Sequence, residues 1–482
     1  MRAAIAFILP FVLASVVSGC GDDPERTACT RDLDCDASHL CTADPTRAPE
    51  DLEPLPLGCG EPLLGAPPAS SCAAGDECDH GICLLAGTCA APCETEDDCD
   101  GGERCLDVFA PTGPQALQPV RACVSATDPP SGVRVTRTRV QDALEGSLSG
   151  DRLSFGRWTG SDAGLVAAID PVTPVDAWVP HMSTRGPTPV VLFDSTGADL
   201  VKRNPPTPFG EPVTVLLPNG TDAVLSDEGY EVRVRSSASA DEPVDVRLTE
   251  LRRDEPGTTI DLDLFYVDIE GPSQSGDPPP AYVADALARV EAILGPAGVR
   301  VGDVRQHVVV GELADELGVL EVDTDARIAD LVDLPRLFRL SAGLGRPSVP
   351  VFLVRLVEGA LGISGGIPGP QGMHGTGGSG LAISVGPVRA GVGAEHDIDL
   401  GRVIAHELLH FLGLFHTTED DGFSLEPIED TPECPEDQDE DGTLTPMDCE
   451  EFDADNLMFW AASGEGLTPG QADVVVRGPV LR

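Results

Sequence analysis

The sequence predicts a multidomain protein in which three kinds of structure follow one another: small disulfide-rich modules, a β-sandwich, and an α/β (α+β) domain. Three observations predict this order. Thirteen of the 15 cysteines lie within residues 20–127. Short segments of alternating apolar and polar residues occupy 128–256. From residue 257 to residue 482, strand patterns alternate with helical ones. A chain of 482 residues is long enough for two to four domains.

The net charge of the chain limits the kinds of partner that it can bind. The formal net charge is −50, from 81 acidic and 31 basic residues. A surface of this charge repels nucleic acid and anionic lipid, so we expect no nucleic-acid partner and no membrane contact other than a lipid anchor. It also attracts divalent cations. Aromatic residues make up only 4 % of the chain, so Val, Leu, Ile and Ala must build the cores.

Residues 1–19 have the pattern of an export signal. Arg2 precedes an apolar stretch, 3–17, that is too short for a membrane-spanning helix. The segment ends in Val-Ser-Gly-Cys at 17–20, which resembles a bacterial lipobox, so a lipid on the Cys20 thiol would anchor the chain to the envelope. Alternatively, the protein is secreted and Cys20 belongs to the disulfide framework. Lipidation leaves 14 cysteines, an even number, which favours the lipoprotein.

Residues 20–127 contain an internal repeat of cysteines. After Cys20, three groups of four follow, and the first and third groups both begin C-x5-C-x5-C. We expect three small modules stapled by disulfides, because each has too few large apolar residues for a core of its own. Tight C-x2-C pairs are absent, which argues against metal sites. Each group allows three pairings, and the spacing does not choose among them. The groups are Cys29, Cys35, Cys41 and Cys59; Cys72, Cys78, Cys83 and Cys89; and Cys93, Cys99, Cys105 and Cys123.

The pattern of residues 128–256 is typical of a β-sandwich. Polar and apolar residues alternate in 231–235 and 244–248, and Pro-Asn-Gly at 218–220 is a strong turn signal. The segment contains no catalytic constellation. It is therefore either a binding or prodomain-like accessory module or a rigid spacer.

Strands and helices alternate in residues 257–482. A helix is predicted over 281–294, where apolar residues recur at helical spacing and Gly-Pro follows. Asp397 or Asp399 can cap a later helix. The glycine-rich stretch 362–380 lacks the Lys of a phosphate loop, so it is expected to shape the rim of a cleft. We place His374 and His396 at the surface. Strands are predicted over 259–268, 299–310 and 349–357.

Residues 406–416 read H-E-x-x-H-x-x-G-x-x-H. His406 and His410 are one helical turn apart, so both imidazoles project from the same helix face. Gly413 can end the helix and let the chain turn, which brings His416 back as a third nitrogen ligand. Catalytic zinc sites have three protein ligands. Glu407 lies beside these ligands and is the candidate general base of a zinc hydrolase.

This motif resembles that of the metzincin zinc metalloproteases. Residues 455–460 resemble the Met-turn of that clan, with Met458 below the metal. Two cysteines, Cys434 and Cys449, lie between the last histidine and this turn and make the pappalysin-like subgroup the nearest match. The resemblance covers about residues 257–482 and implies a metzincin-like catalytic domain with a zinc helix and a Met-turn. Many relatives carry Tyr two residues after the methionine, whereas Trp460 occupies that place here.

The resemblance also implies a strand that borders the cleft. An extended peptide substrate would add to an edge strand through main-chain hydrogen bonds. The expected edge-strand residues are Leu381, Ala382, Ile383, Ser384 and Val385.

The acidic segment 437–448 has the spacing of a calcium loop. Carboxylates occupy positions 1, 3, 5 and 12, and Gly442 occupies position 6. A disulfide between Cys434 and Cys449 would staple the loop and lower its ordering cost. The alternative is a solvated acidic loop without an ion. The predicted calcium ligands are Asp437, Asp439, Asp441, Thr443 and Asp448.

Together these patterns predict a zinc-dependent endopeptidase that hydrolyses extracytoplasmic proteins or peptides. It would be held at the bacterial cell envelope by the lipid on Cys20. The main alternative is a non-catalytic surface adhesion lipoprotein with a vestigial zinc site, but an intact Glu407 argues against it. A zinc hydrolase that acts on a non-peptide substrate is the third hypothesis.

Overall fold

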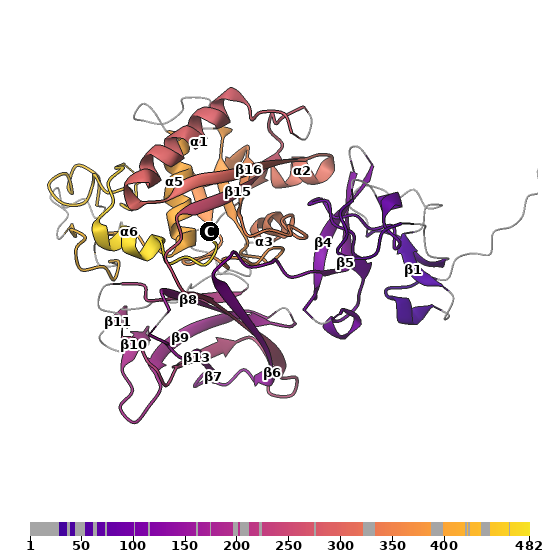
Figure 1. The fold of residues 1–482 in the computed structure, drawn as a ribbon, viewed down its shortest axis with the longest axis horizontal. Coiled ribbons are helices and arrows are strands. Elements are labelled where there is room, and N and C mark those ends of the chain that lie inside the picture. The colour runs from indigo at the N-terminus through magenta and orange to yellow at the C-terminus, as the bar shows by residue number, and fades with distance from the viewer. Residues whose placement is uncertain are drawn as a thin grey trace, which may run out of the picture.

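The chain forms disulfide-rich N-terminal modules, several β-sheets and an α/β region, in the predicted order (Figure 1). This arrangement is a computed structural model. It describes residues 28–35, 39–43, 54–60, 65–72, 75–100, 102–113, 116–160, 162–173, 175–195, 201–202, 212–220, 224–273, 276–321, 333–386, 399–419, 422, 425–434, 444–461 and 463–482. The predicted signal segment 1–19, Cys20 and His396 lie outside these residues.

The disulfides of the three modules follow one rule: each group pairs its first cysteine with its third and its second with its fourth. The predicted disulfide framework is therefore confirmed, and each group adopts one of the three pairings that the sequence left open. The bonds are Cys29–Cys41, Cys35–Cys59, Cys72–Cys83, Cys78–Cys89, Cys93–Cys105 and Cys99–Cys123. The elements are η1 (Asp32–Asp34), β1 (Leu40–Ala43), β2 (Leu57–Gly60), η2 (Gly75–Glu77), β3 (Ala91–Pro92), η3 (Glu96–Asp98), β4 (Arg104–Gly113) and β5 (Ala116–Val124).

Two antiparallel sheets then face each other across one core. The five-stranded sheet has the order β11-β10-β9-β13-β7, and the four-stranded sheet has the order β12-β8-β14-β6. Side chains of both sheets, among them Tyr230, Met182 and Leu165, fill the space between them. The strands are β6 (Val133–Leu144), β7 (Asp151–Phe155), β8 (Gly164–Pro171), β9 (Ala177–Thr184), β10 (Val191–Asp194), β11 (Val201–Lys202), β12 (Val213–Leu217), β13 (Tyr230–Ser236) and β14 (Val244–Arg253).

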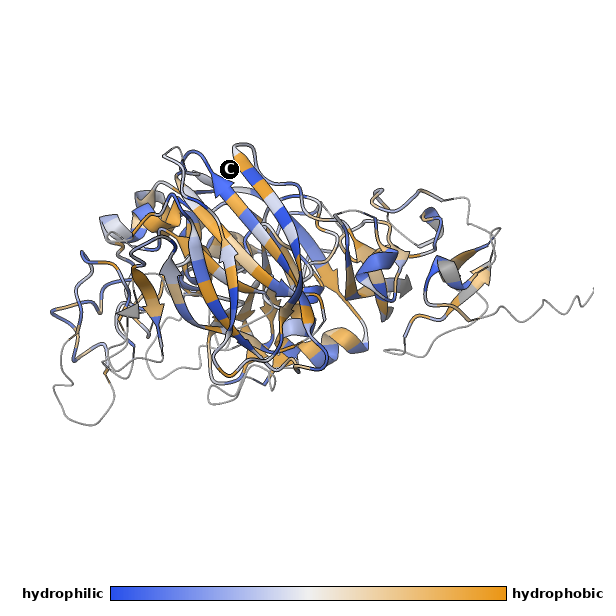
Figure 2. Ribbon diagram, turned by 90° about the horizontal axis from the view of Figure 1, so that it is seen from below, coloured by the Kyte–Doolittle hydropathy of each residue, from blue (hydrophilic) through white to orange (hydrophobic). Residues whose placement is uncertain are grey.

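Strands β8 and β12 of the four-stranded sheet are buried on both faces, because the second face of the sheet packs on the α/β region, whereas the edge strand β6 is largely exposed. Leu217 of β12 belongs to the core between the sheets, whereas its neighbour Leu216 joins Val166 and Leu251 in the core of the α/β region. The five-stranded sheet is therefore the outer layer, and Figure 1 shows it farthest from the α/β region. Its strands carry alternating polar and apolar residues, which appear as blue and orange bands in Figure 2.

The α/β region contains a five-stranded sheet in the order β16-β15-β18-β21-β20. The first four strands are parallel, and β20 runs antiparallel to β21. Helices α1 and α5 pack on one face. The elements are β15 (Thr259–Val267), α1 (Ala281–Leu294), η4 (Gly295–Ala297), β16 (Arg300–Val309), α2 (Glu312–Leu317), β17 (Val319–Leu320), α3 (Asp333–Arg339), β18 (Val349–Val354), β19 (Leu356–Val357), β20 (Gly362–Ser364), β21 (Leu381–Ser384), α5 (Leu400–Leu412) and α6 (Pro469–Val475).

The third cysteine module covers part of the opposite face of this sheet. Phe109 of β4 and Leu117 of β5 belong to the same buried cluster as α2, α3 and Phe265 of β15. The second module also contacts the α/β region, because the Thr88 hydroxyl donates a hydrogen bond to the Gly343 carbonyl at 2.7 Å. The α/β region is thus enclosed by the sandwich on one side and by a cysteine module on another.

One predicted strand has a different place in the sheet. Residues 381–384 form β21, but β21 lies between β18 and β20 and is not an edge strand. The edge strand on this side of the sheet is β20, a three-residue strand that begins at Gly362. A segment rich in glycine and serine carries a weak strand signal, so the sequence did not reveal it. The prediction for Leu381 to Val385 is therefore wrong in position, and Val385 lies beyond the end of β21.

Among the described residues, no helix is long and apolar enough to cross a membrane.

Candidate metal centre

Helix α5 carries the first two histidines and is fixed at its N-terminus by Asp399. The Asp399 carboxylate accepts hydrogen bonds from the backbone N–H groups of Gly401 and Arg402, at 2.9 and 3.4 Å. Arg289 of α1 contacts the same carboxylate at 2.8 Å. The cap and the ion pair together fix α5 against α1. Of the two aspartates that the sequence proposed, Asp399 is the cap, and Asp397 lies outside the described residues.

Gly413 ends the helix, as the sequence predicted. Its φ angle is 116°, in the left-handed region that favours glycine. Its backbone N–H donates to the carbonyls of Leu409 and His410. A Cβ at this position would lie 2.7 Å from Cδ2 of Leu216 in the sandwich. Backbone conformation and packing both exclude a side chain here, and the chain turns towards His416.

The turn brings the three histidines together. Their Nε2 atoms are 3.0 to 3.2 Å apart in every pair among His406, His410 and His416. Three nitrogens at about 2.0–2.1 Å from one tetrahedral ion would be about 3.3–3.4 Å apart. The observed spacing is close to that value, so these residues could hold a metal ion such as zinc.

The second ring nitrogen of each histidine defines the tautomer. Nδ1 of His406 lies 2.7 Å from the carbonyl oxygen of Leu457, and Nδ1 of His410 lies 2.7 Å from that of Leu414. A carbonyl only accepts, so both Nδ1 atoms carry the hydrogen and both Nε2 atoms present lone pairs to the common centre. Such lone pairs repel one another unless a cation lies between them. This is the strongest indication of a metal site.

The third histidine has a charged partner. Nδ1 of His416 lies 2.7 Å from Oε2 of Glu419. A carboxylate behind a histidine ligand fixes the ring and makes the opposite nitrogen a stronger donor. Sequence reasoning missed Glu419, although its position three residues after His416 in an acidic run was a usable signal.

Burial keeps the helical histidines neutral. It lowers the pKa of His406 to about 3, and the electrostatic interaction with the neighbouring His416 ring lowers it further. The pKa of His410 is lowered for the same reasons. A metal ligand must be an unprotonated imidazole, so the surroundings favour the ligating form at neutral pH.

Glu407 lies beside the centre, on the side of the edge strand. It is 7 % exposed, and burial raises its pKa to about 8 while no cation is near. The backbone N–H of Ser364 in β20 donates to its carboxylate. Gly362 permits this approach, because a Cβ there would lie 2.6 Å from Cγ of Glu407. A nearby dication would favour the ionised carboxylate that a general base requires.

Met458 is fully buried in the turn that follows. Its backbone N–H donates to Oδ1 of Asn456 at 2.8 Å, and Asn456 in turn donates to Gln471 of α6. The Leu457 carbonyl of this turn accepts from His406. The turn is thus connected directly to His406, a candidate metal ligand, which places it next to the centre.

The predicted calcium loop is mostly outside the described residues, which exclude Asp437, Asp439, Asp441 and Thr443. Asp448 is buried, and its carboxylate accepts hydrogen bonds from the backbone N–H and hydroxyl of Thr445. The disulfide between Cys434 and Cys449 is present, as predicted. Calcium binding therefore stays a prediction.

Comparison with protein-family models and with curated proteins finds no match. Among solved structures, a family two carbohydrate esterase from Cellvibrio japonicus matches 47 % of this chain and 80 % of its own, at 10 % identity and a TM-score of 0.11. A TM-score this low carries no argument about fold or function.

Proposed function

We propose that the protein is a zinc-dependent endopeptidase of the metzincin type, nearest to the pappalysin-like subgroup. The observation that carries the proposal is the convergence of three Nε2 atoms beside a buried glutamate. Three neutral nitrogen ligands leave a coordination position open, which is typical of catalytic rather than structural zinc. The motif, the turn around Met458 and the Cys434–Cys449 disulfide support the family assignment.

Glu407 acts as the general base in this proposal. Zinc held by the three histidines would polarise the substrate carbonyl and lower the pKa of water. Glu407 takes a proton from the attacking water and passes it to the leaving amine. The N–H of Ser364 holds the carboxylate in position. Met458 supplies an apolar wall and takes no part in acid–base chemistry.

The edge strand favours a polypeptide substrate. Among the described strands, β20 pairs only with β21, so its other side has no strand partner. The same strand contacts Glu407 through Gly362 and Ser364. A peptide added to this edge would therefore run past the general base. An ester or amide of a small molecule would make no use of this strand.

Seven disulfides are typical of an extracytoplasmic protein. We propose that the substrate is likewise an extracytoplasmic protein, and that a lipid on Cys20 anchors the enzyme to the bacterial envelope. Mass spectrometry of the N-terminal peptide of membrane-derived protein tests the anchor. A peptide that begins at lipidated Cys20 is expected, and an unmodified Cys20 thiol would contradict it.

The decisive experiment is cleavage of a denatured general protein substrate by the full chain. The full chain is required because the sandwich contributes Leu216 and Val166 to the core of the α/β region. We expect cleavage by the zinc-loaded protein, and none after chelation or in Glu407→Gln. If the zinc-loaded wild type is inactive while zinc is bound stoichiometrically, the adhesion hypothesis replaces the peptidase.

A further inference from the structure

A pocket lies where the third cysteine module, the four-stranded sheet and the glycine-rich segment meet. Three arginines line it: Arg104 of β4, Arg137 of β6 and Arg247 of β14. None of its described lining residues is acidic, although acidic residues outnumber basic ones by 81 to 31 in the chain. The fold thus gathers positive charge into one hollow of a strongly negative protein.

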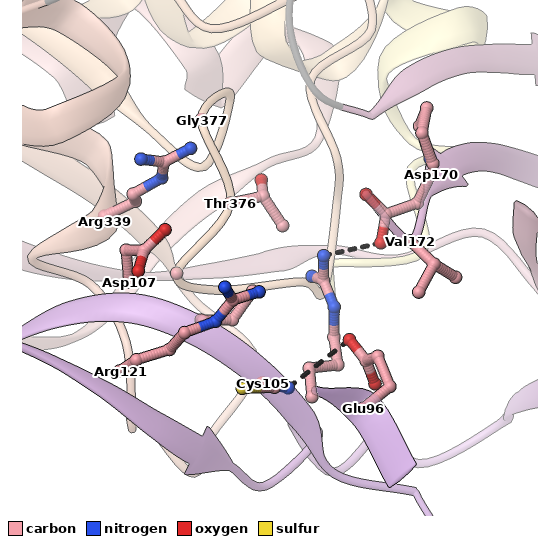
Figure 3. A pocket seen from close by; sticks show the side chains of 13 residues that line it. Glu96, Cys105, Asp107, Arg121, Asp170, Val172, Arg339, Thr376 and Gly377 are labelled. Atoms are coloured by element: carbon pink, nitrogen blue, oxygen red, sulfur yellow. Dashed lines mark hydrogen bonds and ion pairs between the residues drawn. The ribbon is translucent and has the colours of Figure 1, made fainter. Parts of the chain in front are cut away.

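A neighbouring pocket shows where the compensating acids lie (Figure 3). It also has Arg104 in its wall, together with Glu96 and Asp170. Asp170 pairs with Arg104 at 2.5 Å, and Arg247 pairs with Glu96. The two carboxylates hold these guanidinium groups from the side of the neighbouring pocket. They leave the first pocket without a negative charge of its own.

Arg137 differs from the other two arginines of the cluster, because among the described residues the exposed Asp128 is the only carboxylate whose charge acts on it. No carboxylate among the described residues forms an ion pair or a hydrogen bond with it. Burial lowers its pKa, and the positive charges of Arg247 and Arg104 lower it further. A bound anion would relieve this repulsion between like charges.

His374 supplies the second, independent observation. It lines the same pocket and is only 7 % exposed, so its expected surface position is wrong. Its Nε2 lies 3.0 Å from the Arg346 carbonyl and therefore carries the hydrogen. Its Nδ1 is a buried acceptor without a partner among the described residues. Water or a molecule bound beside the ring could supply the missing donor.

We propose that this pocket binds a phosphate group in its hydrogen phosphate form. The guanidinium groups of Arg104, Arg137 and Arg247 bind the negative oxygens, as arginine does in other phosphate sites. The P–OH group donates to Nδ1 of His374. Sulfate has the same shape but no proton to donate at neutral pH, so the pocket discriminates against it.

The site would connect all three parts of the molecule. Arg104 comes from a cysteine module, Arg137 and Arg247 come from the sandwich, and His374 comes from the glycine-rich segment. That segment also contacts the metal helix, because Gly369 donates a backbone hydrogen bond to the Phe411 carbonyl. Phosphate is therefore expected to stabilise the assembled protein. This inference does not depend on the peptidase proposal.

Titration calorimetry of the full chain with inorganic phosphate tests the proposal, with sulfate and chloride at equal ionic strength as comparisons. We expect phosphate to bind and to raise the unfolding temperature by about 2 °C or more at ten times Kd. Arg137→Gln should weaken binding at least about tenfold. Arg134→Gln is the matched control, since Arg134 lies on the same strand but pairs with Asp162 and Asp254.

Three results would overturn the proposal: no binding of phosphate, equal binding by Arg137→Gln and Arg134→Gln, or equal affinity for sulfate. Both variants carry the same metal centre, so any phosphate bound at the metal contributes equally to both measurements and does not affect the difference between them. Glycerol 1-phosphate distinguishes a phosphomonoester ligand from inorganic phosphate. Affinity equal to that of the free ion indicates a phosphomonoester ligand, and affinity only for the free ion indicates inorganic phosphate.

Discussion

The metal centre and the cysteine-rich modules are held together by different means. At the centre, three histidines converge because α5 is buried along its length and each second ring nitrogen has an acceptor. In the modules, the same crossed pair of disulfides occurs three times, and in the first module it joins only short elements, η1, β1 and β2, that bury few large side chains. The metal centre depends on packing and hydrogen bonds, and the first module depends mainly on covalent bonds.

This difference predicts what breaks each region. The centre should respond to substitutions that move a ring or a turn by less than 1 Å, because close-packed interiors transmit such shifts. The first module should tolerate surface substitutions and fail when its disulfides are removed.

The largest expected effect is at Glu407. Glu407→Gln removes the base and keeps the shape of the side chain, so we expect the rate of peptide hydrolysis to fall by at least about 10²- to 10⁴-fold. Zinc content by elemental analysis should stay at the wild-type value. A variant that keeps more than a tenth of wild-type turnover would show that Glu407 is not the base.

Removing one disulfide at a time should affect the metal centre and the first module differently. Replacing Cys29 and Cys41 by serine should destabilise the first module by about 2–5 kcal/mol, measured by limited proteolysis, with zinc content unchanged. The matched control replaces Cys434 and Cys449, which pack against Phe459 beside Met458. That change should lower zinc content and activity. Equal effects of both pairs on zinc would contradict the comparison.

The turn after the metal helix is the most sensitive backbone position. Gly413→Ala should cost about 1–3 kcal/mol of folding free energy, from the left-handed conformation and the contact with Leu216. Gly298→Ala is the control, since Gly298 has φ of 80° but nothing within 4 Å of an added Cβ. Denaturant unfolding should show the larger loss in Gly413→Ala, together with weaker zinc binding. Equal losses would mean that the contact with the sandwich adds nothing.

A smaller effect is expected from the carboxylate behind His416. Glu419→Gln keeps a hydrogen-bond acceptor and removes the charge, so zinc affinity should fall by about 10- to 100-fold, measured by competition with a chelator. Glu433→Gln, an exposed change in the same segment, should leave affinity unchanged. Similar values for both variants would assign Glu419 a role at the surface only.

The features that were predictable from the sequence are those that depend on local residue patterns. The helix 281–294 has the predicted bounds, and Gly413 ends the metal helix where the motif required it. Features set by distant parts of the chain were not predictable. The order of β20 and β21 depends on a three-residue strand, and burial of His374 depends on the meeting of three regions. The position of Glu419 behind His416 likewise required the turned chain.

X-ray absorption at the zinc edge of the full-length, zinc-loaded protein tests the central claim most directly. The convergence of His406, His410 and His416 predicts one zinc ion with three imidazole nitrogens at about 2.0–2.1 Å and no sulfur ligand. His416→Gln should lose one imidazole from the spectrum. A zinc ion bound by sulfur, or a spectrum unchanged in His416→Gln, would contradict the account.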